Sequence, residues 1–202
     1  MAQAESEMKM RILFAAKKLF ARQGFDGTSV RQICEEAGAN VALISYYFGG
    51  KEKVYRALFE CFFPGQRMSQ YEDLLKSPVE GLKLLISEII SFSMNDKELS
   101  SIIQQEMVMV SPRTELIVSF TGPVWKKARE LLEQGREQSL FHFDSLDQAL
   151  MMVVGVTLAH KKQNCYSGLL TDGPPKREET VESAVRFVLL ALGADTAGTA
   201  PS

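Results

Sequence analysis

The sequence predicts an all-α protein in which a small N-terminal three-helix unit precedes a larger helical domain. Apolar residues recur at the three- and four-residue spacing of helices along most of the 202 residues, whereas the alternation typical of strands is nearly absent. Glycine and proline interrupt the chain at short intervals up to residue 65 and at longer intervals beyond it. Capping motifs stand where the longer helices are expected to begin.

The first two helices of the N-terminal unit are predicted from periodicity and caps. The first is expected over roughly residues 5–23, with Gly24 as its C-cap. Its inward face consists of Ile12, Ala16, Leu19 and Phe20. Thr28 is expected to be the N-cap of a second, shorter helix over 29–37, which Gly38 ends.

A third short helix is expected to begin four residues later, with Val41, Ile44 and Phe48 facing inward. Gly49 and Gly50 then break the chain. A fourth helix is expected over 51–63, where Pro64-Gly65 stops it.

The helices beyond residue 77 are expected to be longer. Ser77-Pro78-Val79-Glu80 combines a capping box with proline at the first helical position and predicts a helix over roughly 78–95. Another is expected over about 97–110. Ser111-Pro112 starts a third, which Gly122-Pro123 either kinks or splits before 123–139.

Two further helices complete the prediction. Ser145 and Gln148 form a capping-box pattern at the start of a long helix over 146–170, and the last helix is expected over 177–192. The small polar residues that follow are expected to be disordered. The expected organisation is an N-terminal domain at 1–50, a helical domain at 51–193 with helix 51–63 as the link, and a tail at 194–202.

The charge is distributed unevenly along the chain. Residues 1–59 hold nine Lys and Arg against six Asp and Glu, a net charge of +3, whereas the rest carries −5. A basic head can face a polyanion while an acidic body keeps the protein in solution. An excess of three charges does not by itself identify a nucleic-acid partner.

Composition argues against several classes of protein. Three cysteines far apart and two histidines predict neither a disulfide framework nor a metal site, so we expect no metal, no cofactor and a reduced, cytoplasmic protein. The N-terminus lacks the apolar run of a signal peptide, and the longest apolar stretch is about half of the roughly 20 residues that a bilayer span needs. No GxSxG, P-loop, HExxH or GxGxxG motif is present, so no enzyme is predicted.

The second and third helices have the features of a helix-turn-helix. They are joined by a turn in which Gly38 tolerates a positive φ. The third helix has an unpacked side that can face DNA: Asn40, Ala42, Leu43, Ser45 and Tyr46. Asn, Ser and Tyr can hydrogen-bond to base edges, and Ala and Leu can contact a thymine methyl group. The pattern alone leaves open a protein-interaction module in which Tyr46-Tyr47-Phe48 is ordinary core.

The segment GFDGTSVRQICEEAGANVALISYYFGGKEKVYRALF resembles the DNA-binding domain of the TetR family of transcription regulators. That family shows G(F/Y)xxT(S/T), then (I/V)AxxAG, a recognition helix ending Y(H/Y)F, and (G/S)KExL. This chain has Gly24-Phe25, Thr28-Ser29, Ile33, Ala37-Gly38, Tyr46-Tyr47-Phe48 and Gly50-Lys51-Glu52. The resemblance covers about residues 8–60.

The resemblance implies a role for each matching residue. Near the phosphate backbone it implies Thr28, Ser29, Arg31, Tyr47 and Lys51; at the major groove it implies Asn40, Val41, Ala42, Ser45 and Tyr46. The family often has Lys or Arg in place of Val41 and Tyr in place of Ser45, so its usual operator preferences cannot be transferred. For Val41 we favour packing over DNA contact.

The resemblance also implies a homodimer, formed through a four-helix bundle of helices 146–170 and 177–192 from each subunit. Residues 149–159 are apolar nearly all round, which requires cover on every side, and Gly155 would allow close approach. An ordinary internal core helix remains the alternative. A dimer would place two recognition helices about 34–36 Å apart, to read a palindromic operator in double-stranded DNA.

Methionine and aromatic residues of the larger domain predict a pocket for a small apolar or amphipathic effector. The predicted lining is Phe92, Met107, Trp125, Met151 and Met152, although each can also be plain core. Polar residues that could orient a ligand are Gln104, Gln105, His160 and Tyr166. The resemblance implies that ligand binding moves helix 51–63 and changes the separation of the two DNA-reading heads.

The predicted function is therefore a sequence-specific transcription regulator, a repressor that a small molecule releases from its operator. The alternative is a DNA-binding protein without an effector, which marks chromosomal sites or recruits a protein partner. A helical adaptor would leave the free face of the third helix unexplained.

Overall fold

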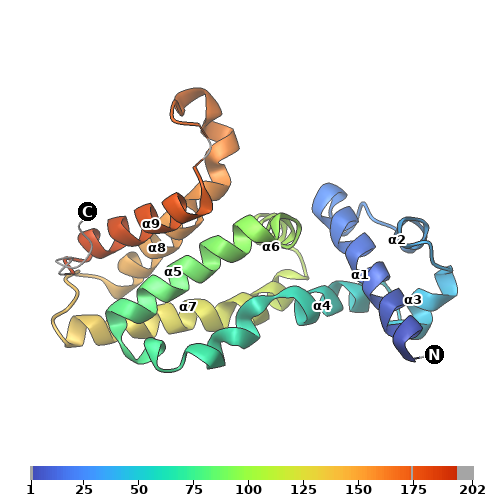
Figure 1. Ribbon diagram of the computed structural model, residues 1–202, viewed down its shortest axis with the longest axis horizontal. Coiled ribbons are helices and arrows are strands. Elements are labelled where there is room, and N and C mark those ends of the chain that lie inside the picture. Colours follow the sequence, from blue (N-terminus) through green and yellow to red (C-terminus); the bar gives the residue numbers. More distant parts are fainter. Residues whose placement is uncertain (1, 174, 195–202) are drawn as a thin grey trace. The chain divides into compact units, whose positions relative to one another are not determined.

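The computed structural model describes residues 2–173 and 175–194, and within them it contains helices and no strand (Figure 1). The predicted all-α class is confirmed for this part of the chain. The helices form two compact units, one made of Met1–Gly65 and Asp96–Thr121, the other of Gln66–Asn95 and Gly122–Ser202. The predicted domain boundary at residue 50 stays a prediction.

The first unit is built around α1. Its helices are α1 (Ala2–Gln23), α2 (Val30–Ala37), α3 (Val41–Tyr47), α4 (Lys51–Phe62), α6 (Lys97–Met109) and the beginning of α7 (Thr114–Glu137). α1 packs against α2, α4 and α6, and α2 packs against α3. The predicted apolar stripe of α1 is buried, and Phe20 stacks on Phe25 with ring centroids 5.4 Å apart.

The start of α2 differs from the prediction. Its N-cap is Ser29, whose hydroxyl accepts a hydrogen bond from the backbone N–H of Gln32 at 3.2 Å, while the Gln32 side chain accepts from the backbone N–H of Ser29 at 2.8 Å. Thr28 is buried and donates its hydroxyl to the carbonyl of Gly24 at 2.8 Å. Thr28 therefore stabilises the end of α1 and cannot cap α2.

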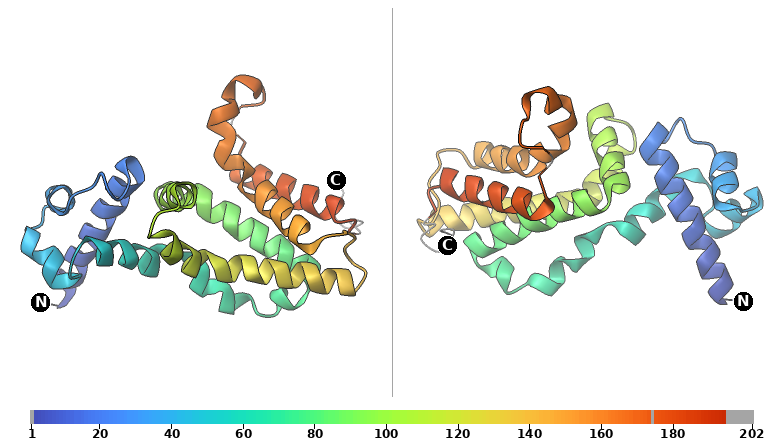
Figure 2. Two further views of the ribbon diagram at one scale, coloured as in Figure 1. Left: turned by 180° about the vertical axis from the view of Figure 1, so that it is seen from behind. Right: turned by 45° about the horizontal axis from the view of Figure 1, so that its top comes forward.

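The second unit contains α5 (Pro78–Asn95), the larger part of α7, α8 (Leu146–Leu158) and α9 (Arg177–Ala191). α5 packs against α8 and α9, which also pack against each other (Figure 2). Their core includes Ile86, Ile90, Val153, Val188 and Leu189. Two short 3-10 segments, η1 (Pro64–Tyr71) and η2 (Leu74–Lys76), precede α5.

The structure decides between two alternatives for α7 and differs from the prediction for the helix after it. α7 continues through Gly122-Pro123, so of the two predicted alternatives the split does not occur. The helix predicted over 146–170 is α-helical only to Leu158 and continues as the 3-10 segment η3 (Ala159–Leu169), which projects from α8 (Figures 1 and 2). No residue of η3 is buried, so packing does not hold this segment in a regular α-helix.

The predicted tail begins with a packed residue. Ala194 is buried in the core of the second unit, and residues 195–202 lie outside the described part. Across the described residues, none of the helices combines the length and apolar character needed to cross a membrane.

Candidate nucleic-acid interface

The recognition helix α3 is packed on one side only. Ile44 is fully buried and Phe48 is half-buried, whereas Tyr46 is 75% exposed. Val41 is 48% exposed, so the prediction that it packs inward is wrong. Leu43 is the first residue of this seven-residue helix that is partly buried, so Val41 and Ala42 lie outside the core.

The exposed face of α3 consists of Val41, Ala42, Ser45 and Tyr46, next to the capping residue Asn40. The Asn40 side-chain oxygen accepts a hydrogen bond from the backbone N–H of Ala42 at 2.9 Å. Asn40 therefore uses its carbonyl to hold the start of the helix, and its amide NH2 is the group that can donate to a base. This face offers an amide, a hydroxyl, a phenol and two small apolar groups, which suits base edges in a major groove.

The predicted phosphate-binding residues of α2 fall into two kinds. Ser29 and Arg31 are exposed, and Arg31 pairs with Glu35 at 3.0 Å. Such an exposed pair contributes little free energy and can be exchanged for a phosphate. The side chain of Thr28 is buried in its bond to Gly24, so the structure does not offer it to DNA.

Lys51 is engaged within the protein. Its ammonium donates to the carbonyls of Phe25 at 3.0 Å and Thr28 at 2.8 Å, and lies 4.0 Å from the centroid of the Phe25 ring. These contacts tie the start of α4 to the loop between α1 and α2. They give Lys51 a structural role that the sequence motif did not reveal.

Arg113, at the start of α7, holds the same loop. Its guanidinium lies over the Phe25 ring. It donates one hydrogen bond to the carboxylate of Asp26 at 3.1 Å and another to one carboxylate oxygen of the buried Glu106, also at 3.1 Å. Ser111 donates its hydroxyl to the other oxygen of Glu106. The buried carboxylate holds the pKa of Arg113 above its usual range, against the opposing effect of burial. The loop preceding α2 is thus held by ionic contacts that sequence periodicity cannot indicate.

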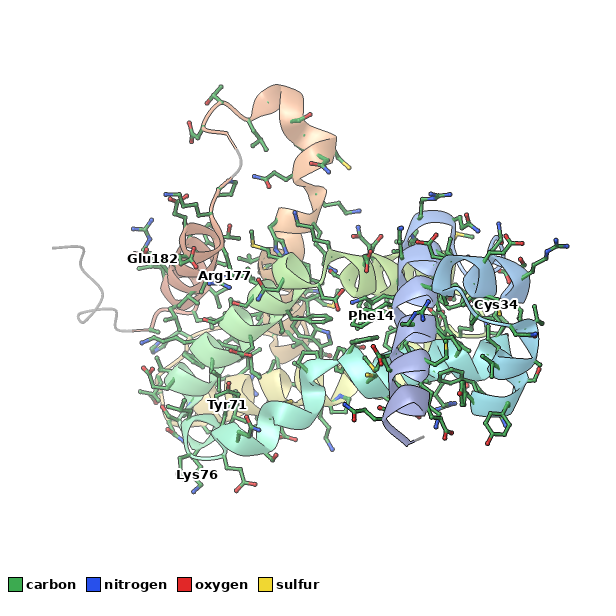
Figure 3. The ribbon with its side chains drawn as sticks, turned by 45° about the vertical axis from the view of Figure 1, so that its right-hand side comes forward. Phe14, Cys34, Tyr71, Lys76, Arg177 and Glu182 are labelled. Carbon is green, nitrogen blue, oxygen red and sulfur yellow. The ribbon has the colours of Figure 1, made fainter. Side chains whose placement is uncertain are left out.

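Tyr47 is half-buried, and the ammonium of Lys9 lies 5.2 Å from its ring centroid. Lys9 is a basic residue near α3 that the sequence motif missed, because it lies near the start of α1, 38 positions before Tyr47. Cys34 of α2, labelled in Figure 3, is buried, and this burial raises the pKa of its thiol. Cys34 is therefore a core residue of the reading unit and not a reactive thiol.

The five predicted pocket residues are divided between the two compact units. Met107 belongs to the first compact unit, while the others belong to the second. Phe92 and Trp125 are half-buried. Met151 and Met152 are both exposed on α8. The pocket stays a prediction, and its two α8 residues lie on an outer surface of their own unit.

Comparison with known proteins agrees with this geometry. The sequence model for bacterial regulatory proteins of the tetR family matches residues 12–58. The chain is 34% identical over 115 residues to the probable HTH-type transcriptional regulator YttP of Bacillus subtilis, covering 55% of this chain and 56% of that protein. It is 26% identical over 161 residues to the HTH-type transcriptional repressor NicS of Pseudomonas putida, covering 77% of this chain and 76% of that protein.

Solved structures extend the similarity beyond the DNA-binding unit. HlyIIR, a hemolysin II transcriptional regulator, superposes with a TM-score of 0.75 at 26% identity over 93% of this chain and 98% of its own. FadR of Bacillus subtilis, solved with stearoyl-CoA, has a TM-score of 0.69 at 21% identity over 90% of this chain and 98% of its own, and this likeness is one of fold. Residues 12–58 of the chain therefore match the tetR family of bacterial regulatory proteins, and the similarity of the chain to helix-turn-helix transcription regulators extends over most of its length.

Proposed function

We propose that this transcription regulator is a homodimeric repressor that binds a palindromic operator and leaves it when a small apolar or amphipathic molecule binds the helical body. The observation that carries the DNA-binding part is the exposed face of α3. Tyr46 lies three-quarters exposed on a short helix whose other side is packed. A large, solvent-exposed aromatic side chain beside polar groups is typical of a binding surface, and the groups on this face suit double-stranded DNA.

An apolar surface on α8 and α9 supports the homodimer. Met151, Met152, Phe187 and Leu190 are exposed there, and this set is called the α8–α9 face below. Gly155 is exposed on the same helix as the methionines, and a Cβ added to it would meet nothing within 4 Å. A second copy placed on this face would bury these side chains and could approach closely at Gly155.

The relatives support repression and a small-molecule effector. NicS is a repressor, and the FadR structure contains stearoyl-CoA, an amphipathic molecule. We infer that α4 transmits effector binding to the DNA-binding helices, since it starts at the Gly49-Gly50 break and is tied to the α1–α2 loop by Lys51. The protein acts by binding in the cytoplasm, and no catalytic role is proposed.

A gel-shift titration of the full chain against DNA from its own upstream region tests the proposal. Saturable binding that resists competitor DNA and weakens with salt is expected. Tyr46→Ala should lower the preference for specific over random DNA by about tenfold, the loss of a base contact of about 1–3 kcal/mol. Tyr166→Ala, which removes an exposed tyrosine of η3, is the matched control and should bind like the wild type. Equal specificity in both variants would contradict the assignment of Tyr46 to base recognition.

A further inference from the structure

The corner between α6 and α7 contacts the loop that leads into α2, and both belong to the first compact unit. The contact is made by Arg113, whose Cζ lies 4.2 Å from the centroid of the Phe25 ring and whose guanidinium donates to the carboxylate of Asp26 at 3.1 Å. Arg113 is 87 positions from Asp26 and lies outside residues 12–58, which match the family model. The DNA-binding motif of that family therefore assigns this side chain no role.

The shape of this corner is set around the buried residue Glu106. One carboxylate oxygen of Glu106 accepts from the hydroxyl of Ser111, and the other accepts from Arg113 at 3.1 Å. Its backbone carbonyl accepts from the N–H of Val110 at 3.1 Å and from the hydroxyl of Thr114 at 3.2 Å. Val110 has a φ of 48°, which a β-branched residue rarely adopts and which persists only where surrounding contacts impose it. These contacts hold Arg113 in one place.

The loop that Arg113 contacts determines where α2 begins. Phe25 is buried against Phe20 and Tyr55, so the backbone of the loop is fixed by the position of this ring. Ser29, four residues after Phe25, caps α2, and α2 packs against α3. A displacement of the loop is therefore transmitted to the exposed face of α3. Hydrogen bonds to base edges weaken steeply with distance and angle, so the placement of α3 affects specific binding more than binding to phosphates.

The exposure of the two ionic partners favours positioning over direct contact with DNA. The side chain of Asp26 is 84% exposed, whereas that of Arg113 is 14% exposed. The guanidinium of Arg113 already donates to the carboxylates of Asp26 and Glu106. An arginine that binds a phosphate needs N–H donors that the phosphate can reach. Arg113 is therefore better placed to hold the loop than to bind DNA.

We propose that Arg113 is a positioning residue for operator recognition, which rests on the assignment of base recognition to α3 in the proposed function. Through Phe25 and Asp26 it fixes the α1–α2 loop, and the loop sets the positions of α2 and of the exposed face of α3. The α6–α7 corner is then a working part of the DNA-binding unit.

Fluorescence anisotropy of the full chain tests this role with two DNA duplexes. One is an operator that the wild-type chain selects from random-sequence duplexes, and the other is a scrambled duplex of the same length. Arg113→Gln should lower the ratio of operator affinity to scrambled affinity about tenfold. Arg129→Gln removes the same charge from an exposed ion pair of the second unit and should stay within twofold of the wild type. An unchanged ratio in Arg113→Gln, or an equal loss in Arg129→Gln, would overturn the proposal.

Asp26→Asn breaks the same ion pair at its exposed end, where a substitution does not disturb the core. Removal of a negative charge strengthens binding to any DNA when only long-range electrostatics matter. Positioning predicts the opposite sign for the operator, whose affinity should fall about threefold while that of the scrambled duplex stays the same or rises. Glu60→Gln, at an exposed position of α4, is the matched control and should not lower operator affinity. Equal strengthening on both duplexes in Asp26→Asn would count against the role of Arg113.

The salt dependence of binding separates a positioning residue from a phosphate ligand. The logarithm of the affinity falls with the logarithm of the salt concentration, with a slope of about 0.9 for each phosphate contact. Arg113→Gln should keep the wild-type slope on the scrambled duplex. A slope that is smaller by about 0.9 or more would make Arg113 a phosphate ligand and contradict the proposal.

Hydrogen exchange of the DNA-free chain measures the loop directly. In Arg113→Gln, peptides that cover residues 24–37 should exchange at least fivefold faster than in the wild type, and peptides of α9 should exchange at the same rate. Equal acceleration in both segments would mean that Arg113 acts on overall stability, and no acceleration would mean that it does not hold the loop. Either result would reject the positioning role.

Tyr46→Ala separates the failure of this role from the failure of the proposed function. If the wild-type chain selects no sequence, or if Tyr46→Ala keeps the wild-type affinity ratio, base recognition by α3 is rejected together with the role of Arg113. If Tyr46→Ala lowers the ratio but Arg113→Gln and Asp26→Asn do not, α3 remains the reading helix and only the role of Arg113 is rejected. A lower ratio in all three variants is the expected result.

Discussion

Lys51 stabilises the fold through contacts within the protein, although the sequence motif indicates a contact with DNA. Its ammonium is held by two carbonyls of the α1–α2 loop and by the face of Phe25. A hydrogen bond from a charged donor contributes about 1.5–3 kcal/mol, so the tether is a considerable part of the stability of a small unit.

Lys51→Met keeps the apolar stem and removes the donors. We expect the free energy of unfolding to fall by about 2–3 kcal/mol, measured by urea denaturation. Lys53→Met, which changes an exposed lysine on the same helix, should change stability by less than about 0.5 kcal/mol. If Lys51→Met retains full stability but loses DNA affinity, Lys51 is a phosphate ligand after all.

Lys161 predicts a pH dependence of stability. Burial lowers the pKa of Lys161 from 10.5, its ordinary value in an unfolded chain, to about 8 in the folded chain, so the unfolded chain binds more protons between these two pH values. The free energy of unfolding contributed by this group therefore rises as the pH increases through that window. Paired denaturation curves of wild type and Lys161→Gln, below and above the window, should show a rise that is smaller in the variant. Parallel pH profiles would mean that burial does not shift this lysine.

At the scale of elements, the end of α7 depends on a glycine. The backbone N–H groups of Leu140 and Phe141 donate to the carbonyl of Gly135, at 2.8 and 3.0 Å, and the buried Phe141 ring lies against this glycine. A Cβ added to Gly135 would come within 2.0 Å of the ring. α7 therefore ends where the chain folds back and the Phe141 ring packs on the helix at Gly135.

Gly135→Ala should displace Phe141 and lower the free energy of unfolding by about 1–3 kcal/mol, the usual cost of overpacking a core. Thermal unfolding measures the change. Gly168→Ala, at an exposed position where an added Cβ meets nothing within 4 Å, should leave the melting temperature nearly unchanged. Equal melting temperatures for the two variants would show that Phe141 does not pack on Gly135.

Other helices show which boundaries follow from the local sequence and which depend on tertiary packing. α5 begins at the proline that the capping motif indicated, because capping and proline geometry are local properties. Pro123 does not end α7, because an interior proline can be tolerated where the helix on both sides is packed, as Ile117 and Ala128 are here. η3 departs from the predicted α-helix because none of its residues is buried.

At the scale of the whole molecule, the proposed homodimer depends on the α8–α9 face. Phe187 is 62% exposed on α9 and contributes the largest side chain to that face. Burying it against a second copy would stabilise association, and a charge there would have to be buried without a partner.

Phe187→Glu should convert the dimer to a monomer, which sedimentation velocity would measure. The variant should also bind the operator at least tenfold more weakly, since one subunit reads only half of a palindrome. Glu182→Lys, a charge change elsewhere on α9 (labelled in Figure 3), should remain dimeric. A dimeric Phe187→Glu protein would place the interface on another surface.

The sequence by itself determined the features that arise from local chemistry. The helices of the DNA-binding unit, the left-handed Gly38 turn and the exposure of Ala42, Ser45 and Tyr46 on α3 follow from periodicity, glycine tolerance and caps within a few residues. The tertiary structure decided which of these groups remain available. Thr28 and Lys51 match the family motif, but their side chains donate hydrogen bonds to backbone carbonyls of the folded protein. Val41 is exposed although its spacing suited the core. The Ser93–His160 contact joins residues 67 positions apart, which only the packing of α5 against α8 can bring together. Local rules specify where helices begin and end, whereas the partners of a side chain depend on contacts between distant segments.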